Sequence, residues 1–157
     1  MLRAGSFLVV LLASTFSALA QVPQYGPSVN LEQARKAIAA AVAEARKNNW
    51  PVAIAVTDTH GLLVAFEKID DTQTASVPIA IDKAASAAMY RRPTKVLQDV
   101  LAAGGAGLRV LNLRGASTVE GGVPIIADGK IIGAVGVSGV NADQDGVVAK
   151  AGADALK

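Results

Sequence analysis

The sequence predicts an α+β protein in which helices pack on an antiparallel β-sheet. Two segments have the pattern of β-hairpins, and segments with helical periodicity precede and follow each of them. Because a hairpin joins antiparallel strands, this order excludes a parallel doubly wound sheet. We expect an antiparallel sheet of about five strands, flanked by helices, in a single domain over residues 21–157.

Residues 1–20 are predicted to be a secretory signal peptide that precedes this domain. Arg3 supplies a positive charge, residues 7–12 are apolar, and Ala18 and Ala20 occupy the small-residue positions before a cut at Gln21. The apolar run is short for a membrane span, which favours cleavage over an uncleaved anchor. We therefore expect a periplasmic or secreted protein, with no membrane span once the signal is removed.

The first half of the domain begins with an extended lead-in, followed by a helix and a hairpin. Asn30 and Gln33 have the spacing of a capping box for an amphipathic helix that ends near residue 48. Short apolar runs at residues 52–56 and 62–67 surround a turn that contains Gly61, which is typical of a hairpin.

A second helix is expected after the hairpin, with Ser76 as its N-cap and Pro93 just beyond its end. Its many alanines would allow a close approach to a sheet or to a partner helix. The residues expected on its buried face are Val77, Ile81, Ala84, Ala85, Ala88 and Met89.

The second half of the domain repeats the order of helix, hairpin and helix. Thr94 is expected to cap a shorter helix that stops at Gly104, and the segment from there to residue 118 is expected to be irregular. Asp128-Gly129 is the strongest hairpin signal in the chain, with strands at residues 123–127 and 130–138. A final helix, capped within residues 141–145, is expected to end near residue 155.

Composition excludes several classes of function. Lys and Arg number 15 and Asp and Glu number 13, so the net charge is +2, and this near-balance argues against electrostatic capture of nucleic acid. Cysteine is absent, which excludes disulfides, thiolate metal sites and covalent c-type haem attachment. The chain has one histidine, so a site built from two imidazoles of one subunit is excluded as well.

Two features are candidates for binding. His60 is a candidate axial ligand for haem iron or an acid–base group, because neutral imidazole is a common iron ligand; the alternative is a polar turn residue. Arg91, Arg92 and Lys95 form a compact basic cluster that could hold carboxylates such as haem propionates through charge-assisted hydrogen bonds. The alternative for this cluster is a solvated helix end.

Four stretches of the sequence resemble the GlcG/HbpS family. They are residues 56–63 (VTDTHGLL), residues 79–84 (IAIDKA) ahead of Arg92-Pro93-Thr94, residues 121–125 (GGVPI), and residues 128–139 (DGKIIGAVGVSG) with Asp145 downstream. Together they extend over nearly all of the chain after residue 30, and the last stretch is the most specific.

The resemblance implies a profilin-like fold and homo-oligomers, from dimers toward octamers, for which the alanine-rich second helix would suit an interface. Secreted members of the family bind haem, and some are reported to degrade it or to act with a sensor kinase. Family members do not share one axial ligand. Beside His60 we therefore take Thr118 as a second candidate, through its oxygen, and Met89 and Tyr90 as a third.

The leading hypothesis is an exported haem-binding protein that acts in haem sequestration, redox sensing or peroxide-dependent haem degradation. The alternative is a periplasmic binder of small organic acids, or an enzyme accessory to glycolate, diol or alcohol catabolism. In that case residues 121–124 and 136–139 would line a polar pocket. A third hypothesis is a structural module without a small ligand. No complete catalytic constellation is recognisable, so no enzymatic activity is assigned.

Overall fold

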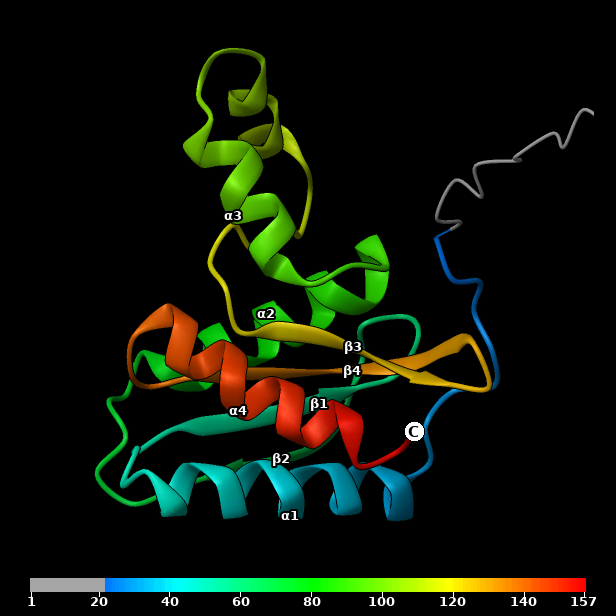
Figure 1. Cartoon of the computed structure of the whole chain (residues 1–157), viewed down its shortest axis with the longest axis vertical. Helices are drawn as coiled ribbons and strands as arrows, with labels where there is room; N and C mark the ends of the chain where they lie inside the picture. Colours follow the sequence, from blue (N-terminus) through cyan, green and yellow to red (C-terminus); the bar gives the residue numbers. More distant parts are fainter. Residues whose placement is uncertain (1–21) are drawn as a thin grey trace, which may run out of the picture.

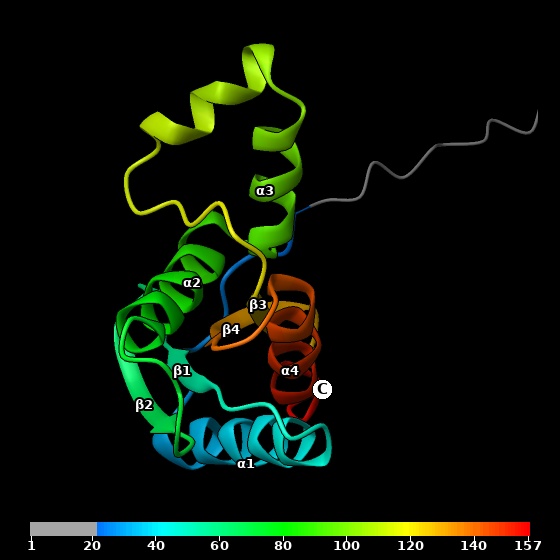
Figure 2. The ribbon, with the colours of Figure 1, turned by 90° about the vertical axis from the view of Figure 1, so that its left-hand side faces the viewer.

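A four-stranded antiparallel sheet with helices on both faces forms the body of the molecule in the computed structural model, which describes residues 22–157 (Figures 1 and 2). The predicted signal peptide lies outside the described residues. The elements are α1 (Leu31–Lys47), β1 (Ala53–Thr57), β2 (Leu63–Lys68), α2 (Ser76–Tyr90), α3 (Thr94–Ala102), the 3₁₀ helix η1 (Gly105–Asn112), β3 (Gly122–Ala127), β4 (Lys130–Ser138) and α4 (Ala142–Asp154).

The α+β class and the two antiparallel hairpins are confirmed, and the strand order is β2-β1-β4-β3. The expected number of about five strands is too high, since the sheet has four. The lead-in makes one isolated bridge to the sheet, between Tyr25 and Ile131. Pro23 and Pro27 flank this bridge and have no N–H to donate, so the pairing does not extend into a strand.

The two central strands, β1 and β4, sort large and small side chains onto opposite faces of the sheet. Ile54 pairs with Val137 on the face covered by α1 and α4, whereas Ala55 pairs with Gly136 on the face covered by α2. The other pairs follow the same sorting: Val56 with Val135 on the first face, and Ala53 with Ser138 and Thr57 with Ala134 on the second.

Helix α2 lies directly on the small-residue face. A Cβ on Gly136 would stand 2.1 Å from the carbonyl oxygen of Ala80 and 2.3 Å from the nitrogen of Ala84, so the helix backbone touches the strand. The expected buried face of α2 is therefore rotated from the observed one. Met89 is exposed, and the buried residues are Ser76, Ala80, Lys83, Ala84, Ser86, Ala87 and Ala88.

The helix caps that depend on neighbouring residues agree with the sequence prediction. At two other predicted caps, the side chain bonds to a distant part of the chain instead. The capping box of Asn30 and Gln33 is present at the start of α1. Ser76 and Thr94 are not N-caps; each is the first residue of its helix and fully buried. The hydroxyl of Ser76 accepts a hydrogen bond from Ser138, and that of Thr94 accepts one from the backbone N–H of Gly122.

Helix α3 and η1 project from the body as an arm, seen above the sheet in Figure 1. The arm begins at Thr94, and η1 occupies the segment that was expected to be irregular. Several large apolar side chains on it are exposed, among them Leu108 and Leu111. Within residues 22–157, no helix is long and apolar enough to cross a membrane.

Candidate functional site

A cleft of about 440 Å³ lies where the end of α2, the start of β3 and helix α4 meet. Cavities of about 300–1,000 Å³ with apolar walls and a few polar groups are typical of small-molecule sites. The lining residues are Pro23, Arg91, Arg92, Pro93, Lys95, Glu120, Gly121, Gly122, Val123, Pro124, Ile126, Gly146, Lys150, Asp154 and Lys157.

One wall of the cleft carries the predicted basic cluster. Helix α2 ends at Tyr90, and the chain turns into α3 through Arg91, Arg92 and Pro93, and all three residues line this wall. The Nε atom of Arg92 donates to the Tyr90 carbonyl at 3.0 Å. Lys95, the second residue of α3, forms an ion pair with Asp99 at 2.8 Å, and this hydrogen bond raises the pKa of Lys95.

Tyr25 of the lead-in fixes the end of α2 beside this wall. Its hydroxyl donates to the carbonyls of Ala88 and Met89 at 2.9 and 3.1 Å. The guanidinium carbon of Arg91 lies 5.6 Å from the centre of the Tyr25 ring, within the range of a cation–π contact. Among residues 22–157, neither Arg91 nor Arg92 has a carboxylate partner.

The opposite wall belongs to α4 and the end of the chain, and sequence reasoning missed it. Lys150 and Lys157 both form ion pairs with Asp154, and these hydrogen bonds lower the pKa of Asp154. The carboxylate of Glu120 rests against α4 at Gly146, because a Cβ on Gly146 would lie 2.6 Å from Oε1 of Glu120. In the sequence, the two lysines stand three and four residues from Asp154, a spacing that indicates only ion pairs along one helix. It gives no sign that these residues line a cleft.

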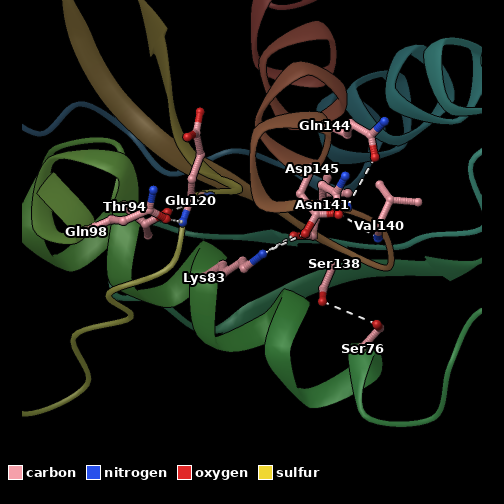
Figure 3. A network of polar contacts seen from close by, with 12 residues as sticks. Ser76, Lys83, Thr94, Gln98, Glu120, Ser138, Val140, Asn141, Gln144 and Asp145 are labelled. Atoms are coloured by element: carbon pink, nitrogen blue, oxygen red, sulfur yellow. Dashed lines mark hydrogen bonds and ion pairs between the residues drawn. The ribbon is translucent and has the colours of Figure 1, made fainter. Parts of the chain in front are cut away.

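The floor of the cleft is the segment from Gly121 to Pro124, held from α3 (Figure 3). The side-chain oxygen of Gln98 accepts from the backbone N–H of Glu120 at 2.8 Å, and Thr94 accepts from Gly122 at 2.9 Å. Residues 121–124 therefore line a cleft, as the small-acid hypothesis expected, but the floor that they form is apolar, whereas the hypothesis expected a polar pocket. The second segment of that hypothesis does not line the cleft, since Gly136 is packed against the backbone of α2.

A buried ion pair supports this floor from behind. Lys83 of α2 donates to Asp145 of α4 at 2.8 Å and to the carbonyl of Val137 at 3.0 Å, and the two charged side chains are 2% and 3% exposed (Figure 3). A Cβ on Gly121 would lie 2.6 Å from the Val137 carbonyl oxygen and 2.8 Å from the Lys83 nitrogen, and φ there is 128°, so this position requires glycine. Burial raises the pKa of the Asp145 carboxyl, although the bond from Lys83 opposes this shift.

His60 lies in the turn between β1 and β2, outside the cleft. Its side chain is 78% exposed, and Nδ1 is 3.8 Å from a carboxylate oxygen of Asp58. The neighbouring Gly61 packs against α2, because a Cβ on it would lie 3.3 Å from both Ala85 and Met89. His60 and the exposed Met89 are therefore close to the same surface of α2.

Thr118 lies in the segment between η1 and β3 and is partly buried, and it does not line the cleft. This segment is tied to α2 at two points. Ser117 donates its backbone N–H to Ser86, and the hydroxyl of Tyr90 donates to the carbonyl of Arg114. The structure thus brings the predicted basic cluster together in one cleft and leaves both predicted iron ligands, His60 and Thr118, outside it.

The fold and the cleft define a small α+β protein with an apolar ligand cleft rimmed by cations. The family model described as "Haem degrading protein HbpS-like" matches residues 29–154. The chain belongs to this family.

Individual relatives agree with this assignment. Protein GlcG of Escherichia coli (strain K12) is 44% identical over 107 residues, which are 68% of this chain and 78% of GlcG. A crystal structure of a double mutant of HbpS from Streptomyces reticuli superposes with a TM-score of 0.77 at 30% identity, covering 96% of this chain and 99% of that one. A crystal structure of a PduOC–haem complex gives a TM-score of 0.74 at 26% identity, covering 83% and 96%.

The cleft suits part of a haem group. Its apolar floor matches the face of a porphyrin, and Arg91 and Arg92 on its wall, which have no carboxylate partner within residues 22–157, match the propionates. Its lining contains no imidazole, because the only histidine of the chain is His60. The family therefore supports haem binding in general, and the cleft has suitable groups for the ring and the carboxylates.

Proposed function

We propose that this chain is an exported haem-binding protein. The porphyrin would lie on the floor formed by residues 121–124, and Arg91, Arg92 and Lys95 would face its propionates. A bound haem would supply an iron centre capable of redox and peroxide chemistry. The protein's part is to bind the ring, orient its carboxylates and limit the access of water.

The observation that carries this proposal is the pair of guanidinium groups beside an apolar floor. Lys95, Lys150 and Lys157 are each paired with a carboxylate, whereas Arg91 and Arg92 are not paired with one in residues 22–157. An amphipathic ligand that carries carboxylates satisfies both parts of such a site, because guanidinium groups bind carboxylates in bidentate geometry. Haem has this chemistry, and a related structure is a complex with haem.

His60 remains our first proposed iron ligand and Thr118 the second. Both lie outside the cleft, so either could ligate the iron of a haem held on residues 121–124 only from a second copy of the chain, and the test has to separate ring binding from iron ligation. Met89 and Tyr90 stay the third choice; Met89 shares the surface near His60, and the Tyr90 hydroxyl is already bonded to Arg114.

We also propose that the chain forms homo-oligomers. The arm exposes Leu108, Leu111 and Leu113 by 51%, 63% and 40%, and exposed apolar clusters of this kind are typical of association surfaces. The alanines of α2 are used against its own sheet, so the arm is the better candidate for the interface. Light scattering of the purified protein should give a mass above that of one chain, and Leu111→Glu should lower it; a monomer at micromolar concentration would contradict this proposal.

Export and haem binding can be tested on one preparation. The full-length chain is produced in a bacterial host and recovered from the periplasm or medium, and its mass shows whether residues 1–20 have been removed. The protein is then titrated with hemin by absorption, beside His60→Ala and Thr118→Val. Recovery of the uncut chain in the membrane fraction would contradict the export proposal.

The titration has distinct outcomes. A saturable Soret shift that His60→Ala abolishes supports histidine ligation. A shift that survives in His60→Ala and is lost in Thr118→Val supports an oxygen ligand. No saturable shift in the unmodified protein overturns haem binding, and a thermal stabilisation by glycolate or a similar hydroxy acid would then favour the small-acid alternative.

A further inference from the structure

Arg91 has a backbone conformation that its residue type disfavours. Its φ and ψ angles are 54° and 38°, in the left-handed region, where the Cβ of an L-residue is crowded by the following carbonyl. Three other non-glycine residues within 22–157 have a positive φ, namely Asn49, Asp71 and Asp128. Asn and Asp tolerate this region through their short polar side chains, so Arg91 is the exception among the four.

The position of Arg91 would ordinarily favour glycine. It directly follows the last residue of α2, and its backbone N–H closes the helix by donating to the carbonyls of Ala87 and Ala88. Helices commonly end with a left-handed glycine at such a place. Because the helix would end equally well with glycine, the arginine is explained by its side chain. A strained residue at a ligand site is a reason to look for a function there.

Arg91 lines the cleft, and no carboxylate within residues 22–157 pairs with its guanidinium group. The guanidinium carbon lies 5.6 Å from the centre of the Tyr25 ring, and that ring is anchored because its hydroxyl bonds to the carbonyls of Ala88 and Met89. A cation–π contact uses the charge of the guanidinium and occupies none of its N–H donors. The contrast is Lys95 on the same wall, whose ammonium group already bonds to both oxygens of Asp99.

We infer that Arg91 is the residue that selects carboxylate-bearing ligands in this cleft, with its planar fork donating two N–H groups to one ligand carboxylate. This inference rests on the proposed haem-binding function and names the group of the ligand that the cleft recognises. Arg91 itself lines the cleft, and the contact with Tyr25 restricts the rotation of its guanidinium group.

The test compares hemin with hemin dimethyl ester, in which both carboxylates are masked, on the unmodified protein, Arg91→Gly and Arg91→Lys. Arg91→Gly removes the guanidinium group and the strain of a left-handed non-glycine residue, whereas Arg91→Lys keeps the charge but cannot form a bidentate pair. Asn49→Gly is the control for a glycine at a left-handed position, and Arg35→Gln on α1 is the control for loss of one cation. Thermal midpoints are recorded for all variants.

We expect Arg91→Gly to bind hemin about 10- to 100-fold more weakly, Arg91→Lys to be intermediate, and both controls to match the unmodified protein. With the dimethyl ester, the difference between Arg91→Gly and the unmodified protein should disappear. The thermal midpoint of Arg91→Gly should not fall, because glycine relieves the left-handed backbone.

Two results would overturn the inference while leaving haem binding intact. One is hemin binding by Arg91→Gly that equals that of the unmodified protein. The other is an equal loss of affinity of Arg91→Gly for hemin and for its dimethyl ester, which would mean that Arg91 shapes the cleft and does not bind the carboxylates. If the unmodified protein itself fails to bind hemin, the proposed function fails and the inference fails with it.

Discussion

Replacement of Lys83 by methionine tests the buried ion pair behind the cleft floor. Methionine has a similar length, so the change removes the charge and leaves little cavity. Asp145 would then be 3% exposed with no cation beside it, and the Val137 carbonyl would lose the bond from Lys83. An isolated buried carboxylate is so costly that the group takes up a proton instead.

The expected loss can be bounded from the pKa of the carboxyl. Protonation at pH 7 of a group whose ordinary pKa is 3.8 costs about 1.4 kcal/mol for each pH unit between them, which limits this cost to about 4 kcal/mol. The unsatisfied Val137 carbonyl adds about 1 kcal/mol. We therefore expect the free energy of unfolding to fall by about 3–5 kcal/mol at pH 7, in the range for a broken buried pair.

The loss of stability in Lys83→Met should depend on pH, because it arises from the protonation of Asp145. Without Lys83, no cation opposes the effect of burial, so the pKa of Asp145 in the folded state is raised further above its value in the unfolded chain. The contribution of Asp145 to folding stability is then greatest below pH 3.8 and decreases as the pH rises toward 7. Urea unfolding followed by circular dichroism at several pH values measures this slope.

A double variant separates the charge from the packing. Lys83→Met combined with Asp145→Asn should lose the steep slope above pH 4 and recover about 2 kcal/mol at pH 7, because no charge is left buried. The reasoning is refuted if Lys83→Met is as stable as the unmodified protein at pH 7. It is also refuted if the loss is the same at pH 4.5 as at pH 7.

Three further changes test the fold. Gly136→Ala should lower the free energy of unfolding by about 3 kcal/mol or more, since its Cβ meets the Ala80 carbonyl oxygen at 2.1 Å; a melting temperature within about 1 °C of the unmodified protein would refute this close packing. Asn30→Ala removes half of the capping box of α1 and should cost about 1 kcal/mol in urea unfolding, whereas Asn30→Ser should cost much less. Asp154→Asn should cost only about 0.5 kcal/mol at pH 7, because the carboxylate is 37% exposed. The pKa of Asp154 is lowered by its two lysine partners, so this cost should be present above pH 3.8 and vanish as the pH falls through the depressed value; a cost that persists at lower pH would contradict the assignment.

The sequence predicts well those features that depend on residues within one turn of each other. Asp128 and Gly129 have φ angles of 49° and 72°, as the tight hairpin turn requires, and strand β4 has the predicted bounds. The capping box of α1 needs only Asn30 and Gln33. The basic cluster was found for the same reason, because Arg91, Arg92 and Lys95 are neighbours along the chain.

The tertiary structure decides which residues meet across the sheet. Periodicity favours the large apolar side of α2, but the face of the sheet beneath it carries alanine, glycine, serine and threonine, so the small side of the helix is buried. Ser76 and Thr94 had the sequence signature of caps, yet each bonds to a group at least 28 residues away. Because both hydroxyls are buried, their hydrogen-bond partners are the polar groups that the tertiary structure places beside them.

The cleft itself shows the same division. Its arginine wall is contiguous in sequence and was predicted, whereas the wall on α4 and the Lys83–Asp145 pair, 62 residues apart, depend on how α2 and α4 pack on opposite faces of one sheet. Local signals identify residues that can bind a carboxylate. Only the packed sheet determines which surfaces those residues share, because contacts between distant segments depend on the shape and volume of everything buried between them.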